Sequence, residues 1–258
     1  MKTGLISTTH HPLSISLGSL FNNGLPVTSP ECDYHSKINL PRNALGNTQY
    51  EDCFPAGIMT LVQLQVSNAM GSNWVPDEQK TLDLYSSVSG FNLSTHQPDP
   101  GTMLDVGEAF IWKTGINIGQ QAPVVFNPVQ LDPQNERELD IGTEYFGGVG
   151  LCFDMPIFIM EENPPVWDCP ETLDPNNTRT TPGGAGGHFV ASGKYNTLTK
   201  NRRYCVSWGK EIPITQNFIK NYLSAAVCFA SRTTWFNTFG NTVDGINWDQ
   251  LDVLSKKI

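Results

Sequence analysis

Hydrophobic side chains recur at helical spacing in three stretches of the first half of the chain. Residues 53–70 carry apolar side chains three and four positions apart, a spacing that predicts one buried helix face. Two shorter stretches with the same spacing, 77–89 and 103–114, end just before Gly90 and Gly115, and glycine is a common residue after the last turn of a helix. The pattern therefore predicts three helices in this half.

The second half alternates short apolar runs with turn residues, a pattern typical of strands. The expected strands cover residues 123–126, 148–153, 189–194, 204–208 and 225–231. Helical patterns cover residues 132–145, 215–223 and 247–254. Helices that come first and an antiparallel sheet that follows indicate an α+β fold, in which the early helices pack on the later sheet.

No shift in composition separates independent domains, so we expect residues 1–258 to form a single domain. Its parts are an extended N-terminal arm over 1–45, a helical lobe over 46–120 and a β-rich lobe over 121–258. The stretch 154–187 is dense in Pro, Gly, Asn and acidic residues. A loop of this length inside a compact domain is uncommon, and it is often a lid or a binding loop.

The composition excludes several classes of function. A formal charge of -9 and scattered basic residues argue against a nucleic-acid partner, because phosphate binding needs a basic surface. The sequence predicts no membrane span and no signal peptide, so we expect the protein in the cytoplasm of the cell that makes it. The six cysteines form no C-x-x-C pair, and we expect neither a metal site nor a cofactor; a bridge between Cys32 and Cys169 stays open.

Cys53 stands at the start of the first predicted helix, directly after Asp52. Asp is a favourable N-cap residue, and the positive end of a helix lowers the pKa of a thiol there. We expect capping and solvent exposure of Asp52 to keep its own effect on the thiol small. The sequence so far allows either an activated thiol or an ordinary buried cysteine.

A glycine-rich run, residues 183–187, precedes His188. It is not a phosphate-binding loop, because no Lys-Ser or Lys-Thr follows and the next element is a predicted strand. The run instead presents His188 at the start of that strand. Ser207 and Trp208 follow about twenty residues later, so the chain has the order expected of a thiol nucleophile, its base and an orienting shell.

These motifs resemble the papain-like cysteine peptidases, and more closely the uncharacterised papain-like proteins of tailed phages and prophages. The resemblance covers roughly residues 40–235. The matching segments are Gly46-Asn47-Thr48-Gln49-Tyr50-Glu51-Asp52-Cys53, Leu84-Tyr85-Ser86-Ser87-Val88-Ser89-Gly90-Phe91-Asn92, Gly186-Gly187-His188 and Ser207-Trp208-Gly209. The resemblance implies a papain-like fold, with an N-terminal helical lobe packed on an antiparallel β-sheet or barrel lobe.

The resemblance also implies roles for individual residues. Cys53 would be the nucleophile and His188 the base. Asn47, six residues before the cysteine, would donate to the oxyanion, with Gln49 as a nearby substitute. Trp208 would shield the histidine.

One position departs from the family pattern. The Asn that orients the histidine falls on Val206, which cannot accept an imidazole N–H. A backbone carbonyl, Asn196 or Ser207 would have to replace it.

Two functions follow. The first is a phage-associated cysteine hydrolase, a peptidase or amidase, that acts on a peptide or protein substrate. The second is a non-catalytic papain-fold protein that serves a phage virion as a structural or decoration module and contacts other virion proteins or copies of itself, because fold alone does not establish catalysis.

Overall fold

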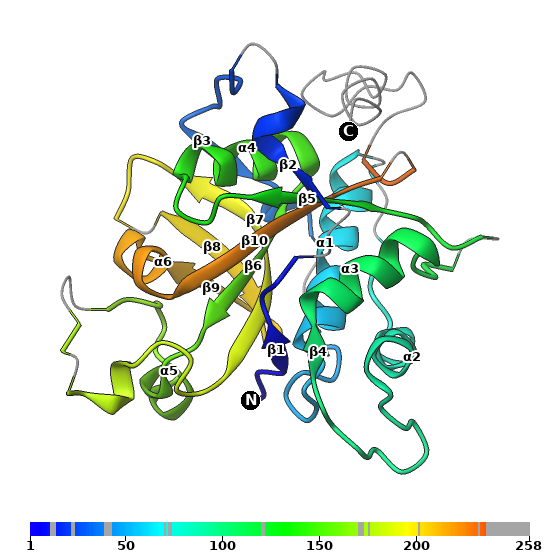
Figure 1. The fold of residues 1–258 in the computed structure, drawn as a ribbon. Helices are drawn as coiled ribbons and strands as arrows, with labels where there is room; N and C mark the ends of the chain where they lie inside the picture. Colours follow the sequence, from blue (N-terminus) through cyan, green and yellow to red (C-terminus); the bar gives the residue numbers. More distant parts are fainter. Residues whose placement is uncertain are drawn as a thin grey trace.

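Three helices stand beside a curled sheet in the structure, which is a computed structural model of the chain (Figure 1). The structure describes residues 1–10, 14–21, 24–38, 43–69, 71, 74–119, 122–169, 173–174, 176–200, 202–231 and 233–235.

The three early helices are α1 (Cys53–Ala69), α2 (Glu78–Ser89) and α3 (Leu104–Lys113), which confirms the prediction from the apolar spacing. The ends of α2 follow from the sequence. Asp77 accepts a hydrogen bond from the amide of Lys80 at one end, and Gly90 adopts a left-handed φ of 78° at the other. Almost every residue of α1 is buried, so α1 is the central helix of the fold.

The sheet is mixed and mostly antiparallel. Its main path runs β2-β5-β10-β6-β7-β1-β4, and β8 and β9 extend from β7. The strands of the second half are β5 (Asn127–Leu131), β6 (Val149–Asp154), β7 (Gly187–Asn196), β8 (Arg203–Ser207), β9 (Lys210–Ile214) and β10 (Leu223–Ala230). Predicted strands therefore coincide with β6, β7, β8 and β10.

Two strands differ from the prediction, and a proline stands in each. The predicted strand 123–126 is wrong, because Val124 there makes only an isolated bridge to Ile116, and the strand begins after it. Pro128 lies inside β5, where proline argues against a strand. Pro213 likewise obscured β9 in the sequence. Among the described residues β8 is the one strand that pairs with β9, and the other edge of β9 makes an isolated bridge from Ile214 to Trp167, so this edge tolerates a residue without an N–H group.

The later helices are α4 (Glu136–Phe146), α5 (Ile157–Glu162) and α6 (Gln216–Tyr222). The first and last match predicted helices, although α4 begins after Asn135 rather than at Asp132. The expectation of a structureless stretch over 154–187 is wrong, because α5 and a short 3-10 helix, Thr178–Thr180, form within it. The predicted C-terminal helix 247–254 lies outside the described residues.

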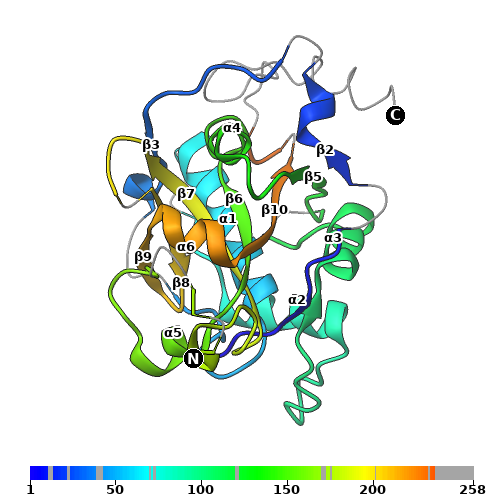
Figure 2. The same cartoon turned by 60° about the vertical axis from the view of Figure 1, so that its left-hand side comes forward.

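The N-terminal residues contribute strands to the sheet. These are β1 (Leu5–Ser7), β2 (Ile15–Ser16) and β3 (Glu31–Asp33), with short 3-10 helices at Leu17–Leu20 and His35–Lys37. Strand β1 lies between β7, to which it is antiparallel, and the short β4 (Thr102–Met103), to which it is parallel. It thus joins the sheet to the segment that leads into α3. The second view shows the blue N-terminal segment running up beside α3 (Figure 2).

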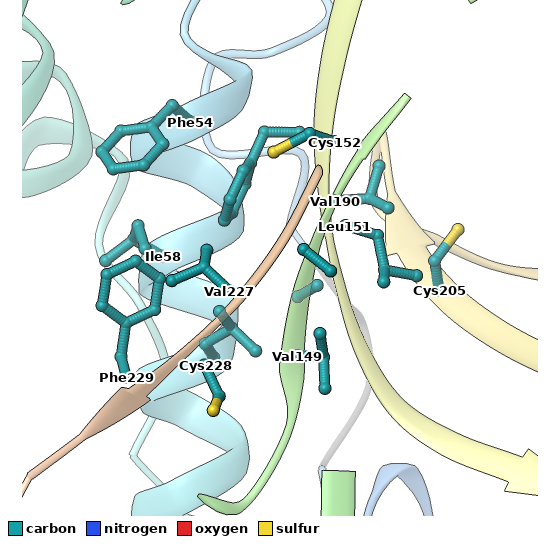
Figure 3. Packing of buried hydrophobic residues seen from close by; sticks show 14 of the residues in the cluster. Phe54, Ile58, Val149, Leu151, Cys152, Val190, Cys205, Val227, Cys228 and Phe229 are labelled. Carbon is teal, nitrogen blue, oxygen red and sulfur yellow. The ribbon is translucent and has the colours of Figure 1, made fainter. Parts of the chain in front are cut away.

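Apolar side chains from α1, β6 and β10 fill the space between the central helix and the sheet (Figure 3). The helix approaches closely because the ring of Phe189 lies against two glycines. A Cβ added at Gly57 would be 2.4 Å from this ring, and one added at Gly150 would be 2.2 Å from it.

None of the six cysteines forms a disulfide in the structure. Cys152, Cys205 and Cys228 are buried core thiols, as their apolar surroundings in the sequence predict. The disulfide between Cys32 and Cys169 that the sequence left open is not formed.

Candidate active site

Cys53 is the first residue of α1, and its side chain is 1% exposed. Its Sγ accepts a hydrogen bond of 3.4 Å from the backbone N–H of Phe189, the residue directly after His188. The expected lowering of the thiol pKa is wrong for this state. Burial raises the pKa of Cys53 above its usual range, and the Phe189 N–H and the helix start oppose that rise only in part.

His188 is the second residue of β7 and is fully buried. Its Nε2 lies 2.7 Å from the Ser207 hydroxyl, and its Nδ1 lies 3.5 Å from the backbone carbonyl of Thr3. Because a carbonyl only accepts, these contacts favour a proton on Nδ1, with Nε2 accepting from Ser207. Burial lowers the pKa of His188 to about 3, so the imidazole is neutral at pH 7.

Cys53 lies beside the backbone of His188, because its sulfur accepts a hydrogen bond from the N–H of the peptide group that joins His188 to Phe189. Within the described chain, no hydrogen bond links the thiol to the imidazole ring itself. The ring nitrogens instead face Ser207 and Thr3.

Trp208 covers the histidine ring. The two rings are stacked, with centroids 4.6 Å apart and planes 16° apart. Ser207 pairs with Lys210 across the β8–β9 hairpin, so Trp208 and Gly209 form its two-residue turn, with φ values of 48° and 74°. A bulky residue rarely adopts a positive φ, and such strain is concentrated at functional sites.

Of the three groups that could replace the missing Asn, Ser207 is the side chain that contacts the imidazole, through its hydroxyl at Nε2. Asn196 is not part of the site: its amide donates to Glu31, and its oxygen accepts from the amide of Leu198. Val206 lies in β8, where it pairs with Ala191.

Asn47 is buried and lines a small cavity that Cys53, Ser207 and Trp208 also line. Its Nδ2 donates to the carbonyl of Tyr50 at 3.3 Å. Gln49 is exposed and is not among the residues that line this cavity. The structure therefore brings Asn47 to the thiol and does not bring Gln49 there.

Asp52 differs most from expectation. It is fully buried rather than exposed, and its carboxylate oxygens have no hydrogen-bond partner among the described residues. It contributes only its backbone carbonyl, which accepts from Ala56, to the start of the helix. Burial raises the pKa of Asp52 to about 8, although the facing Asn47 amide and the backbone oppose the rise.

The N-terminal residues lie on this site, which sequence reasoning missed. Trp208 Nε1 donates to the carbonyl of Lys2 at 3.0 Å, and the amide of Lys2 donates to the carbonyl of Asn47 at 3.2 Å. The carbonyl of Gly4 accepts from the amide of Thr102 at 2.7 Å. Lys2 and Gly4 are thus held by hydrogen bonds to the Trp208 indole and to the backbone of Asn47 and Thr102.

Gly4 was the one signal that the sequence offered for this contact. Its φ is +94°, and an added Cβ would lie 2.1 Å from the carbonyl oxygen of Glu51. Only glycine fits there. Trp167 was also missed, because it lies in the predicted loop, and its ring centroid is 6.3 Å from that of His188 and 5.8 Å from that of Trp208.

The described residues contain no group of three His, Cys, Asp or Glu side chains that could hold a metal ion. In the same part of the chain, no helix combines the length and the apolar character needed to cross a bilayer.

No family model matches the sequence, and no curated protein is similar to it. The fold is similar to that of xylellain, a cysteine protease from Xylella fastidiosa, with a TM-score of 0.60 and 14% identity over 89% of this chain and 94% of that one. Digestive procathepsin L 3 of Tenebrio molitor larval midgut gives a TM-score of 0.55 and 14% identity over 89% of this chain and 76% of that one. ProCathepsin B S9 from Trypanosoma congolense gives a TM-score of 0.52 and 12% identity over 89% of this chain and 86% of that one. The fold is therefore papain-like and α+β.

Proposed function

We propose that the protein is a cysteine hydrolase, a peptidase or amidase, in which Cys53 is the nucleophile and His188 its proton acceptor. One observation carries the proposal. The Cys53 sulfur accepts a hydrogen bond from the peptide N–H directly after His188. The imidazole of His188 contacts the Ser207 hydroxyl and stacks on Trp208. A thiol at the start of a helix beside an oriented histidine is the arrangement that nucleophilic catalysis needs.

In the proposed reaction the Cys53 proton passes to His188 and the sulfur attacks a carbonyl carbon. The tetrahedral intermediate collapses when the C–N bond breaks and His188 returns the proton to the leaving amine. Water then hydrolyses the acyl-sulfur bond. The Asn47 amide and the Cys53 backbone N–H would stabilise the oxygen anion, and the loss of one such donor typically slows a reaction by about 100- to 1000-fold.

The state described above is a resting state for this chemistry. Burial raises the pKa of the thiol and lowers that of His188, so transfer of the proton between them is unfavourable. Residues 2–5 also cover the imidazole and Trp208. The proposed reaction therefore requires these N-terminal residues to move, so that a peptide or protein substrate can take their place.

A second candidate function rests on the same observation, that residues 2–5 cover the site. A thiol that is only 1% exposed suits a non-catalytic papain-fold protein, a structural or decoration module of a phage virion that contacts other virion proteins or its own copies. The resemblance in residues 46–53 and 84–92 supports a phage-associated origin in either case. The cytoplasm of the producing cell or the virion stays our expectation for its location.

Alkylation by iodoacetamide near pH 7 distinguishes the two functions. We expect Cys53 to react about tenfold or more faster than Cys152, a core thiol of the same chain, because only the former has a proton acceptor beside it. His188→Ala should remove that difference. The measurement is peptide mapping by mass spectrometry over time, and equally slow labelling of both cysteines in both proteins would contradict the hydrolase.

A further inference from the structure

The N-terminal segment, residues 2–5, is held at the candidate site through its main chain. The amide of Lys2 donates to the carbonyl of Asn47 at 3.2 Å, and the carbonyl of Lys2 accepts from Trp208 Nε1 at 3.0 Å. Both contacts use main-chain atoms of Lys2, so they are open to any residue at this position. The site therefore binds a peptide backbone here.

Glycines in the neighbouring elements make room for the segment. A Cβ added at Gly101 would be 2.3 Å from the carbonyl oxygen of Gly4, and one added at Gly187 would be 2.5 Å from that of Leu5. The amide of Thr102 donates to the same Gly4 carbonyl at 2.7 Å. A glycine in a strand often marks the close approach of another backbone. These walls are thus shaped to hold a peptide.

The carbonyl of Thr3 faces the imidazole of the site. It lies 3.5 Å from Nδ1 of His188, and the Thr3 hydroxyl donates to the carbonyl of Ala185 at 3.2 Å. A peptide carbonyl thus lies at the side chain that serves as the base in the proposed reaction. The segment therefore occupies the place where a peptide would meet the catalytic groups.

The position of Gly4 excludes side chains. Its φ is +94°, and an added Cβ would lie 2.1 Å from the carbonyl oxygen of Glu51. The obstacle is main chain rather than the end of a flexible side chain, so it cannot turn aside. A peptide with any residue other than glycine at this position should therefore bind much more weakly.

The side chain of Lys2 adds a preference for charge. Its ammonium group forms an ion pair with the carboxylate of Glu51, with Nζ 3.3 Å from Oε1, and both side chains are partly exposed. An exposed pair contributes modestly, so we expect a preference of about fivefold rather than an absolute requirement. An acidic residue in place of Lys2 would face Glu51 with like charge.

We propose that the place of residues 2–5 is a binding site for peptides with a basic residue two positions before a glycine, and that Glu51 selects the basic side chain. This inference rests on the proposed function, because it names the class of peptide for that site. When residues 2–5 leave, the Thr102 amide, the Trp208 indole and the Asn47 carbonyl lose their partners. All three residues are buried, so a peptide that restores these bonds is favoured.

Peptide binding to the full-length Gly4→Ala protein tests the proposal, because the added Cβ forces the chain's own segment off the site. The probe is acetyl-Lys-Thr-Gly-Leu with a C-terminal fluorescein, and the readout is fluorescence anisotropy at pH 7. We expect the Kd to rise about tenfold or more for Lys-Thr-Ala-Leu and about fivefold for Glu-Thr-Gly-Leu. The wild type should bind the probe more weakly than Gly4→Ala, because its own segment competes.

Glu51→Gln in the same background tests the charge preference. It should bring the Kd values of the Lys and Glu peptides to within about twofold of each other. Asp33→Asn is the matched control, because it removes a similarly exposed ion pair, that of Asp33 with Lys194. It should leave the difference between the two peptides unchanged.

A second measurement needs no displaced segment. In the otherwise wild-type chain, Lys2→Glu should speed hydrogen exchange of the Thr102 amide, which donates to Gly4, by about fivefold. Adding Glu51→Lys to this variant should restore slow exchange, because the ion pair is then present with its charges reversed.

Three results would overturn this assignment. One is equal binding of the glycine and alanine peptides, or no binding of the probe at millimolar concentration. Another is a charge preference that Glu51→Gln and Asp33→Asn change alike. The third is exchange at Thr102 that the reversed pair does not restore. Failure of the proposed function is distinct, because neither readout depends on the thiol, whereas Cys53 would then be alkylated no faster than Cys152.

Discussion

The two halves of the site differ in how completely their polar groups are satisfied. On the sheet side, both ring nitrogens of His188 have neighbours, and Trp208 stacks on the ring. On the helix side, the described residues give the Asp52 carboxyl no hydrogen-bond partner and give the Cys53 thiol only the backbone N–H of Phe189. The base is fixed in one orientation, whereas the nucleophile lies in surroundings that disfavour any charge.

This difference has a structural origin. His188 pairs with Phe153 of β6, and Ser207 pairs with Lys210 of β9, so backbone ladders set the positions of both residues. The segment before Cys53 has no such ladder and is closed by turns around Gly46. The comparison teaches that burial disfavours charge on both sides of this site, whereas the polar groups without partners are concentrated on the helix side, and four changes test that conclusion.

The largest expected effect is on stability. Asp52 has a pKa of about 8 in the folded chain against an ordinary value of 3.8. Between these values the unfolded chain loses a proton that the folded chain keeps, so stability falls as pH rises, by about 1.4 kcal/mol per pH unit at most. Asp52→Asn should escape this fall and be more stable than wild type at pH 7, by an amount on the order of several kcal/mol.

Urea unfolding at pH 4 and pH 7 measures this effect. The gain should shrink towards pH 4, because the unfolded wild type is then close to its pKa of 3.8 and partly keeps the proton that the folded chain holds. A constant gain at both pH values would show that packing, not charge, distinguishes the variant.

The next effect concerns closure by the N-terminal residues. Gly4→Ala places a Cβ 2.1 Å from the carbonyl of Glu51, which forces β1 off the site. Alkylation of Cys53 should then rise by about tenfold or more, because the rate follows the population of the open form. Gly24→Ala is the matched control, since Gly24 also has a positive φ but no described residue within 4 Å of an added Cβ. Equal rates in both variants would show that β1 does not limit access.

A smaller effect is expected on the sheet side. Ser207→Ala leaves Nε2 of His188 buried without a partner, which should cost about 1–3 kcal/mol of stability and slow the His188-assisted alkylation of Cys53. Ser192→Ala is the control, because Ser192 is a buried serine of β7 whose hydroxyl makes no hydrogen bond to any residue that the structure describes. It should be neutral or stabilising in urea unfolding, and a matching loss in both variants would contradict the orienting role.

The smallest effect is expected at the contact between the two regions. Trp208→Phe keeps an aromatic ring over His188 but removes the indole N–H that donates to Lys2. One hydrogen bond contributes about 1 kcal/mol, so alkylation of Cys53 should rise only about fivefold or less. A loss of labelling instead would show that the indole supports the histidine more than it holds the N-terminal residues.

The sequence predicted those parts of the fold that depend on local signals. Helix α2 has its cap at Asp77 and its stop at Gly90, and both lie within the segment that they define. Strands β5 and β9 were lost because proline is a local signal against strands, whereas the pairing of these strands is set by distant partners. The candidate site likewise has parts with local signals in the sequence and parts that are set by distant contacts.

Cys53, His188 and Trp208 lie in recognisable motifs, and the sequence named Ser207 among three alternatives for the orienting group. The sequence did not predict the burial of Asp52 or the contact of Thr3 with His188. The first reverses the exposure that a capping residue usually has, and the second joins residues 185 positions apart. Local periodicity carries no information on either.

The Phe189 ring between Gly57 and Gly150 has an evolutionary consequence. Its backbone amide holds the Cys53 sulfur, and its ring sets the spacing between α1 and the sheet. The three positions should therefore change together: a lineage that gains alanine at 57 or 150 must reduce the side chain at 189. In an alignment of distant relatives, this linked triplet would mark the lineage even where the motifs around the cysteine have diverged.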